Sequence, residues 1–384
     1  MEIFNNISAD EFFKNYWQKK PLLIKNAVKD IESPMDPDEL AGLACEPEIE
    51  SRLVLETGGE KPWEVIAGPL SEKTLTSLPE SNWSLSVQGV DRLVPEVSNL
   101  LSYFKFLPNW LLDDILVSYA PDKGSVGAHI DNYDVFIIQA QGKRRWLLGG
   151  KPEYNEEYEE GLDIRLLKSF EPEHEWELST GDLLYIPTRF AHHGIAVGEC
   201  LNYSVGYRAP TDGELIRSLS NWVMEKDLSE KFFRERNPAV QESPGEVTEK
   251  SLAAIAEHMK TLIDTPDFKL WFGEYISEPK TFYAPFEPEL HLSSEELAKR
   301  LEGGEVLESA EGLKRCWIDS EQPALFMEGE RIEVPEACGS EVLALLCDLD
   351  QISFENISNS KNSSESLLEL LTMVYNKGYF AFEQ

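Results

Sequence analysis

Two histidines and one carboxylate are the residues in this sequence best suited to binding a metal ion. His129 and Asp131 stand two residues apart in GAHIDNYDVF, and His192 and His193 follow in PTRFAHHGIAV. Residues two apart on a strand point to the same face, so His129 and Asp131 can converge on one point. Two His and one carboxylate are the facial triad of non-haem Fe(II) oxygenases, which leaves open positions for a co-substrate and oxygen. The alternative is that His129 and Asp131 are only a hydrogen-bonded pair in a turn.

A basic cluster lies between the candidate ligands. Lys143, Arg144 and Arg145 follow the apolar run VFIIQA. A guanidinium is planar and permanently charged, so an arginine held in place here could bind both oxygens of one carboxylate of a dicarboxylate co-substrate.

These residues lie in a region with dense strand signals. Strands are predicted from Ile115 to Arg208 in ILVSYA, DVFIIQA, RRWLLG, HEWEL, DLLYIP, HGIAV and LNYSVGYR, with Gly, Pro and Asp between them. This pattern is typical of an all-β barrel or sandwich. Upstream, the sequence predicts a short helix over 10–17, helices over 36–45 and 94–104, and strands over 22–24, 51–55, 63–67 and 83–87.

Composition changes at Pro210, where helical periodicity replaces the strand signals. Helices are predicted over 214–226 and 248–264, each with an apolar face that needs a partner surface. That partner is either the protein's own β-rich region or a second copy of the chain. Beyond 279, helices over 293–301, 340–348 and 366–377 alternate with short strand signals, which favours a winged-helix module. The predicted divisions are therefore 1–210, 211–278 and 279–384.

The overall composition limits the classes of function. The chain has 384 residues, 42% of them hydrophobic and 27% charged, with a net charge of −35. This charge argues against general nucleic-acid binding, which needs Lys and Arg at phosphates, and it favours a basic partner; solubility alone is the simpler explanation. No apolar run approaches the ~20 residues of a membrane span. The start has no secretory signal pattern, and five scattered cysteines without C-x-x-C fit a reducing cytoplasm.

Several longer motifs resemble one known family. They are YWQKKPLLIKNA, FLPNWLLDDILVSYA, GAHIDNYDVFIIQAQGKRRW, GDLLYIPTRFAHHG and LNYSVGYRAP. The sequence is similar to the JmjC-type ribosomal oxygenases, and within them to the bacterial enzymes that hydroxylate an arginine of large-subunit ribosomal protein sixteen. The resemblance covers the whole chain and implies an α+β architecture. It consists of a double-stranded β-helix (jelly-roll, cupin) domain, a helical dimerisation region and a winged-helix-like C-terminal domain.

The resemblance also implies roles for individual residues. It puts the metal ligands at His129, Asp131 and His192, because the family's last histidine ends a Pro-x-x-Phe-x-His segment, here Pro187 to His192. Strand parity alone leaves His193 open, since His193 shares a face with Ile195 and Val197. The family's co-substrate arginine falls on Arg144, and its neighbours, with opposite parity, would be solvated.

Four further residues are weaker candidates. Asn202 and Ser204 on the last strand are expected near the co-substrate. Tyr133, which follows the His-x-Asp motif, faces either the substrate or the core. Asp122 either pairs with a substrate guanidinium or is a turn residue in APDKG.

The function implied by the family is Fe(II)-dependent hydroxylation of the β-carbon of an arginine in a ribosomal protein by a cytoplasmic homodimer. Three protein ligands leave three sites on octahedral Fe(II), two for 2-oxoglutarate and one for O2. The alternatives are histidine hydroxylation, methyl-lysine demethylation, and a non-catalytic cupin scaffold that binds a partner through its winged helix.

Overall fold

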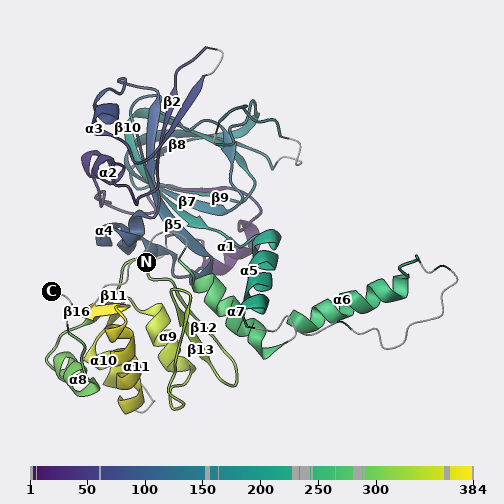
Figure 1. Cartoon of the computed structure of the whole chain (residues 1–384). Helices are drawn as coiled ribbons and strands as arrows, with labels where there is room; N and C mark the ends of the chain where they lie inside the picture. The colour runs from purple at the N-terminus through teal and green to yellow at the C-terminus, as the bar shows by residue number, and fades with distance from the viewer. Residues whose placement is uncertain are drawn as a thin grey trace. The chain divides into compact units, whose positions relative to one another are not determined.

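In the computed structural model (Figure 1), the chain folds into two compact units. One unit covers Met1–Ala209, and the other combines Pro210–Pro279 with Ala284–Gln384. The residues described are 3–5, 7–59, 62–151, 156–162, 164–226, 233, 243, 245–263, 265–279, 288, 290–358 and 364–382. Each unit is described by itself below.

The first unit is built on antiparallel strands. Four strands form its centre: β5 (Leu112–Ala120), β7 (Asp134–Gly149), β9 (Leu183–Ile186) and β10 (Ala191–Tyr207). The sheet order is β1-β9-β7-β10-β5-β4-β2-β3, and β6 and β8 pair with β10 and β7. The outer strands are β1 (Leu22–Ile24), β2 (Ser51–Glu56), β3 (Trp63–Ala67), β4 (Trp83–Val87), β6 (His129–Ile130) and β8 (Pro172–Ser179). The predicted double-stranded β-helix is confirmed.

A break in pairing register bends the long strand β7. Gln139 pairs with Asn202 and Gln141 pairs with Leu201, so Ala140 is an extra residue opposite β10. A bulge of this kind shifts side-chain parity by one residue. As a result Ile137, before the bulge, and Arg144, after it, line the same cavity.

Short helices cover the core of the first unit (Figure 1), namely α1 (Ala9–Asn15), α2 (Pro37–Leu43), α3 (Glu72–Thr76) and α4 (Pro95–Ser98). Phe12, Leu40 and Val97 from these helices pack in one cluster with Phe136 of β7.

The single helix predicted over 94–104 is wrong, because only residues 95–98 are α-helical and a 3-10 helix follows over Asn99–Phe104. The helix tightens at Ser98-Asn99, two residue types that favour caps and turns over helix interiors.

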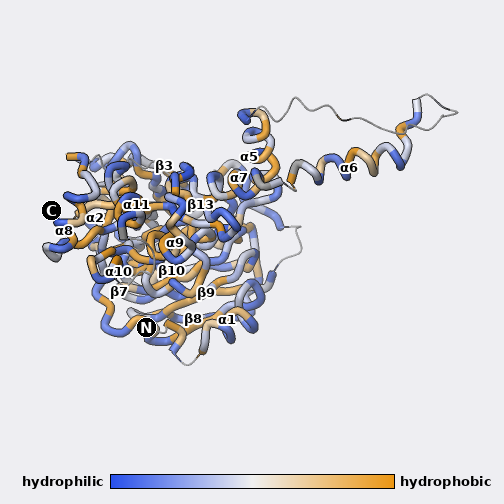
Figure 2. The backbone as a smooth tube through the Cα atoms, turned by 90° about the horizontal axis from the view of Figure 1, so that it is seen from below, coloured by the Kyte–Doolittle hydropathy of each residue, from blue (hydrophilic) through white to orange (hydrophobic). Residues whose placement is uncertain are grey.

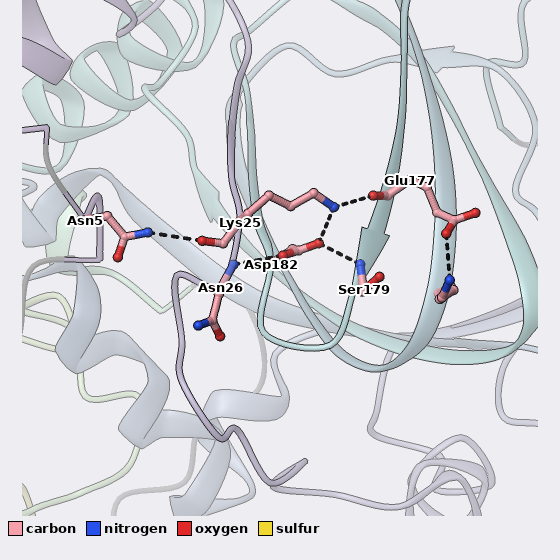
Figure 3. Close-up of polar contacts among 7 residues, drawn as sticks. Asn5, Lys25, Asn26, Glu177, Ser179 and Asp182 are labelled. Atoms are coloured by element: carbon pink, nitrogen blue, oxygen red, sulfur yellow. Dashed lines mark hydrogen bonds and ion pairs between the residues drawn. The ribbon is translucent and has the colours of Figure 1, made fainter.

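A buried carboxylate attaches the segment after β1 to the turn between β8 and β9 (Figure 3). Asp182 accepts hydrogen bonds from Lys25 Nζ at 2.7 Å and from the backbone N–H groups of Asn26 at 2.9 Å and Ser179 at 2.7 Å. Lys25 Nζ also donates to the carbonyl of Glu177 at 2.7 Å. These bonds hold β1 along β9, at the edge of the sheet that carries the candidate site.

The second unit combines helices with two three-stranded antiparallel sheets. Leu297 of α8, Leu343 of α9 and Leu371 of α11 share its core. The helices are α5 (Asp212–Glu225), α6 (Glu249–Ile263), α7 (Pro266–Ser277), α8 (Ser294–Glu302), α9 (Ser340–Asp348), α10 (Phe354–Ser358) and α11 (Ser364–Asn376). The strands are β11 (Leu307–Ser309), β12 (Arg315–Ile318), β13 (Ala324–Met327), β14 (Glu330–Ile332), β15 (Gln351–Ile352) and β16 (Phe380–Phe382).

Five helices of this unit agree with the sequence prediction to within two residues at each end, namely α5, α6, α8, α9 and α11. The short helix α10 was not predicted, and neither was the longer α7. Its sequence, PDFKLWFGEYIS, is rich in aromatic residues and contains Gly273, all of which lower helix propensity. Tertiary packing stabilises the helix instead. Gly273 lets α7 pack directly on Phe326 of β13, since a Cβ at this position would lie 2.3 Å from the ring. Within the described part of the chain, no helix is long and apolar enough to cross a membrane.

Candidate metal centre

Pairing between β6 and β10 brings the candidate metal ligands together. His129 pairs directly with His192, and Asp131 follows β6 by one residue. The ligand atoms of His129, Asp131 and His192 all lie within 4.8 Å of one another. Asp131 Oδ2 is 3.5 Å from His192 Nε2 and 3.9 Å from His129 Nε2. Two imidazoles and one carboxylate therefore point at a common centre.

Backbone carbonyls orient both imidazoles. His129 Nδ1 lies 3.0 Å from the carbonyl oxygen of Gly127, and His192 Nδ1 lies 2.9 Å from that of Phe190. A carbonyl only accepts, so each Nδ1 carries the proton and each Nε2 presents its lone pair to the centre. Burial, together with the nearby His129, lowers the pKa of His192 to about 4, so its imidazole is neutral at neutral pH. This donor set fits a divalent transition metal.

The adjacent histidine is engaged elsewhere. His193 Nε2 lies 2.9 Å from the hydroxyl of Ser125, whereas His192 lines the cavity. The apolar residues that share a face with His193 do not mark the core side of the strand, since Val197 is 42% exposed. His192 and Ala196, on the other face, are buried.

Arg144 is a buried cation without a carboxylate partner in the described chain. It is 2% exposed, and burial lowers its pKa. Its guanidinium donates to Asn202 Oδ1 at 2.6 Å and to the hydroxyl of Ser118 at 3.0 Å. Lys143 and Arg145 point outward, as expected, and pair with Glu177 and Glu175. An uncompensated charge in this position is costly, which indicates that an anion binds beside it.

The triad and Arg144 line one cavity of about 370 Å³. Within the described residues, two buried donors on its wall have no hydrogen-bond partner, Arg144 Nε and Trp146 Nε1. The apolar side chains of Leu116, Val135 and Ile137 form another part of the wall. A cavity with unpaired donors at one place and a metal-ligand set at another fits a small dicarboxylate that spans the two.

The structure also places the weaker candidates. Asn202 holds Arg144 as described, and its Nδ2 lies 3.4 Å from the hydroxyl of Ser204, which lines the cavity.

Tyr133 lines the cavity too, and the charge of Asp131 is the largest cause that raises its pKa. Asp122 is not among the cavity residues, and its carboxylate accepts from the N–H of Gly198 at 2.9 Å, as a turn residue would.

Sequence reasoning missed Ser118 and Trp146. Ser118 reaches Arg144 because it pairs with Asn202 across β5 and β10, 84 residues away in the chain. Trp146 follows Arg144 by two residues and shares its face, and the guanidinium carbon lies 5.4 Å from the centre of the ring. Strand parity after Arg144 was the one sequence signal that could have identified Trp146.

Two protein families match the chain. The JmjC domain matches residues 99–215, and the ROXA-like winged helix matches residues 258–381. Among curated proteins, ribosomal protein uL16 3-hydroxylase of Escherichia coli (strain K12) is 35% identical over 384 residues, 100% of both chains. A probable ribosomal oxygenase of Haemophilus influenzae is 32% identical over 377 residues, 95% of this chain and 93% of that one.

Solved structures of the Escherichia coli ribosomal oxygenase YcfD are similar over the same length. An X-ray structure has a TM-score of 0.87 at 34% identity and covers 98% of this chain and 99% of that one. A structure in complex with cobalt and 2-oxoglutarate has a TM-score of 0.85 at 34% identity, with 99% of each chain covered.

Proposed function

The chain belongs to the JmjC-domain ribosomal oxygenase family, and we propose that it is an Fe(II)- and 2-oxoglutarate-dependent oxygenase that hydroxylates an arginine of ribosomal protein uL16. The observation that carries the proposal is the pairing, in one cavity, of a His129–Asp131–His192 ligand set with the buried cation of Arg144. A relative's structure in complex with cobalt and 2-oxoglutarate supports both components.

Each residue of the site would have a distinct task. His129, Asp131 and His192 would hold Fe(II), which activates O2 for insertion into an unactivated C–H bond while 2-oxoglutarate is oxidised to succinate and CO2. Arg144 would bind the carboxylate of 2-oxoglutarate remote from the metal, with Ser118 and Asn202 keeping the guanidinium in position. Ser204 would complete the polar wall beside it. The protein contributes orientation and exclusion of water, and the cofactor supplies the oxidative chemistry.

The charge of the chain supports a basic substrate. A net charge of −35 attracts a cationic protein by long-range electrostatics, and ribosomal proteins bind an RNA polyanion. The name of the Escherichia coli relative specifies uL16 and the 3-position, which corresponds to the β-carbon of the target residue. Tyr133, on the cavity wall, is proposed to contact the substrate side chain. Asp122 would reach substrate only outside this cavity.

The decisive assay combines the purified protein with Fe(II), 2-oxoglutarate and uL16. We expect succinate to form and one arginine of uL16 to gain a single oxygen atom at its β-carbon, as read by fragment mass spectrometry. Asp131→Ala is the matched control. Oxidation of a histidine, or loss of a methyl group from lysine, would reassign the substrate within the same chemistry. If no 2-oxoglutarate is consumed with any ribosomal protein, the oxygenase proposal is wrong and the scaffold alternative stands.

We also propose that the protein works in the cytoplasm as a homodimer through residues 211–278. Leu252, Ile255, Met259 and Ile263 form one apolar stripe on α6, and each is at least 42% exposed. Figure 2 shows hydrophobic and hydrophilic stretches alternating along this helix. A second copy of the chain would cover the stripe. The cytoplasmic assignment follows from the substrate and from five cysteines that are all free thiols.

A further inference from the structure

A nearly buried ion pair lies beside the metal centre without belonging to it. The guanidinium of Arg189 contacts the carboxylate of Glu156, and the two side chains are 14% and 9% exposed. Arg189 precedes His192 by three residues, and Glu156 lies in the connection between β7 and β8. Two charges withdrawn this far from water are costly unless they hold each other in a defined geometry.

Glu156 begins a segment of residues 156–162 and 164–168, here called the rim segment. It is bonded to itself like a hairpin, since Tyr158 bridges Leu167, Glu159 N donates to Leu166 O at 2.8 Å and Lys168 N donates to Glu157 O at 3.0 Å. Its residues Ile164, Arg165 and Leu166 line the cavity that holds the candidate metal ligands. The rim segment is therefore a wall of the site.

Among the described residues, two polar connections join the rim segment to the chain that carries the metal ligands. On one side, Leu167 N donates to the carbonyl of Ala128 at 2.8 Å, next to His129. On the other, Glu156 binds Arg189, whose own backbone N–H donates to the carbonyl of Asp131 at 2.7 Å.

The backbone at Arg189 supports a role for its side chain. Arg189 has φ +71°, a left-handed conformation that glycine adopts without steric cost and that residues with a Cβ disfavour. A long charged residue at this position indicates that the side chain contributes something that glycine would not.

We propose that Glu156 and Arg189 are positioning residues whose ion pair fastens the rim segment over the cavity and thereby determines how tightly the protein substrate is held. The proposal rests on the proposed function for its kinetic consequence, whereas its structural consequence is independent of any reaction. Neither Arg189 nor Glu156 is a candidate metal ligand or a cavity-lining residue, although the backbone of Arg189 contacts Asp131.

Hydrogen exchange on the metal-free protein tests the structural part. Glu156→Gln removes one charge at nearly constant volume, and Arg189→Gly removes the other while easing the left-handed backbone. Coupling between contacting residues is typically large enough for about a tenfold effect, so we expect the amides of Glu159 and Leu167 to exchange on the order of tenfold faster in both variants. Arg189→Lys keeps the charge and should retain most of the protection.

The matched control breaks a second ion pair on the same segment. Glu160 pairs with Lys168 at 3.7 Å, but their side chains are 92% and 42% exposed, so Glu160→Gln should leave exchange unchanged. Unchanged exchange in Glu156→Gln would overturn the proposal, and so would an equal acceleration in the control. Exchange in Arg189→Lys as fast as in Arg189→Gly would overturn it as well, because the charge would then be irrelevant.

Steady-state kinetics test the consequence for substrate binding. We expect Glu156→Gln to raise the KM for uL16 on the order of tenfold and to change the KM for 2-oxoglutarate by less than about twofold. An equal rise in both KM values would overturn the positioning role, since it would report a general loosening of the site. If neither the wild type nor any variant turns over uL16, the proposed function is wrong. The hydrogen-exchange experiment then still decides whether the ion pair holds the rim segment.

Discussion

At the residue scale, the metal centre depends on which nitrogen each histidine presents. His129 and His192 each donate a hydrogen bond from Nδ1 to a backbone carbonyl two residues earlier, at Gly127 and Phe190. Both hydrogen bonds are local, so the strand that positions the histidine also selects its tautomer. His193 makes a long-range contact with Ser125 instead, which removes it from the cavity.

The first prediction follows from this difference. Asp131→Ala and His192→Ala should each abolish Fe(II)-dependent turnover and lower iron content, because each removes one of only three protein ligands. His193→Ala should retain most of the activity. Succinate formation and bound iron are measured together. An active His192→Ala beside an inactive His193→Ala would show that the ligand is the other histidine.

Arg144 sets the second prediction. Arg144→Lys keeps the charge but loses the planar fork, so it should raise the KM for 2-oxoglutarate with some turnover left. Arg144→Met leaves a buried carboxylate unpaired, which costs roughly 2–5 kcal/mol. That corresponds to a loss of affinity on the order of 30- to 4,000-fold. Iron content should stay near that of the wild type.

The comparison variants for Arg144 are its two neighbours, Lys143→Met and Arg145→Met. Their exposed ion pairs with Glu177 and Glu175 contribute little to stability. A 2-oxoglutarate titration of all four variants distinguishes them. Normal binding by Arg144→Met would mean that another residue holds the co-substrate.

At the element scale, close approach of β7 and β10 holds Arg144 in place. Gly194 pairs with Trp146 across the two strands. A Cβ on Gly194 would lie 2.8 Å from the Trp146 ring and 2.9 Å from Arg144 Nε, closer than real Cβ atoms come. The absence of a side chain at Gly194 is therefore what lets the indole and the guanidinium lie side by side at the cavity wall.

The third prediction is that Gly194→Ala displaces Arg144 or Trp146. Overpacking of this kind typically costs about 1–3 kcal/mol, and we expect a lower melting temperature with 2-oxoglutarate bound on the order of tenfold more weakly. Gly42→Ala, in α2 of the same unit, is the control, because a Cβ there would meet no atom within 4 Å and Gly42 does not line the cavity. Equal effects of the two substitutions would show that the close approach at Gly194 is not special.

At the scale of the whole molecule, the exposed stripe on α6 bears on assembly. Its residues recur at spacings of three and four, which places them on one face of the helix. Apolar side chains gathered in this way are the usual sign of a surface that another chain covers.

The fourth prediction concerns this stripe. Charging it with Leu252→Glu and Ile255→Glu together should yield monomers or insoluble protein, because burying two carboxylates in an apolar interface is costly. Light scattering at micromolar concentration gives the mass. The control pair, Ala253→Glu with Lys260→Glu, charges other faces of the same helix and should leave a dimer. A wild type of monomer mass would refute the assembly.

The sequence by itself determined the chemistry of the site. The two-residue spacing of His129 and Asp131 and the adjacent basic cluster are local patterns, and on a strand local spacing sets which side chains share a face. A β-rich first unit and five helices of the second unit, α5, α6, α8, α9 and α11, were likewise evident from periodicity. The jelly-roll class itself was implied by the resemblance to a family. Resemblance to a family, rather than physical reasoning, selected His192 and Arg144.

Only the tertiary structure decided which face of each strand meets the cavity. Parity along β7 alone would put Ile137 and Arg144 on opposite faces, and the extra residue Ala140 brings them to the same one. The apolar residues beside His193 suggested the wrong face, because a strand's core side depends on what packs against it. Ser118 meets Arg144 and Glu156 meets Arg189 through strand pairing and loop closure, which no short window of sequence encodes.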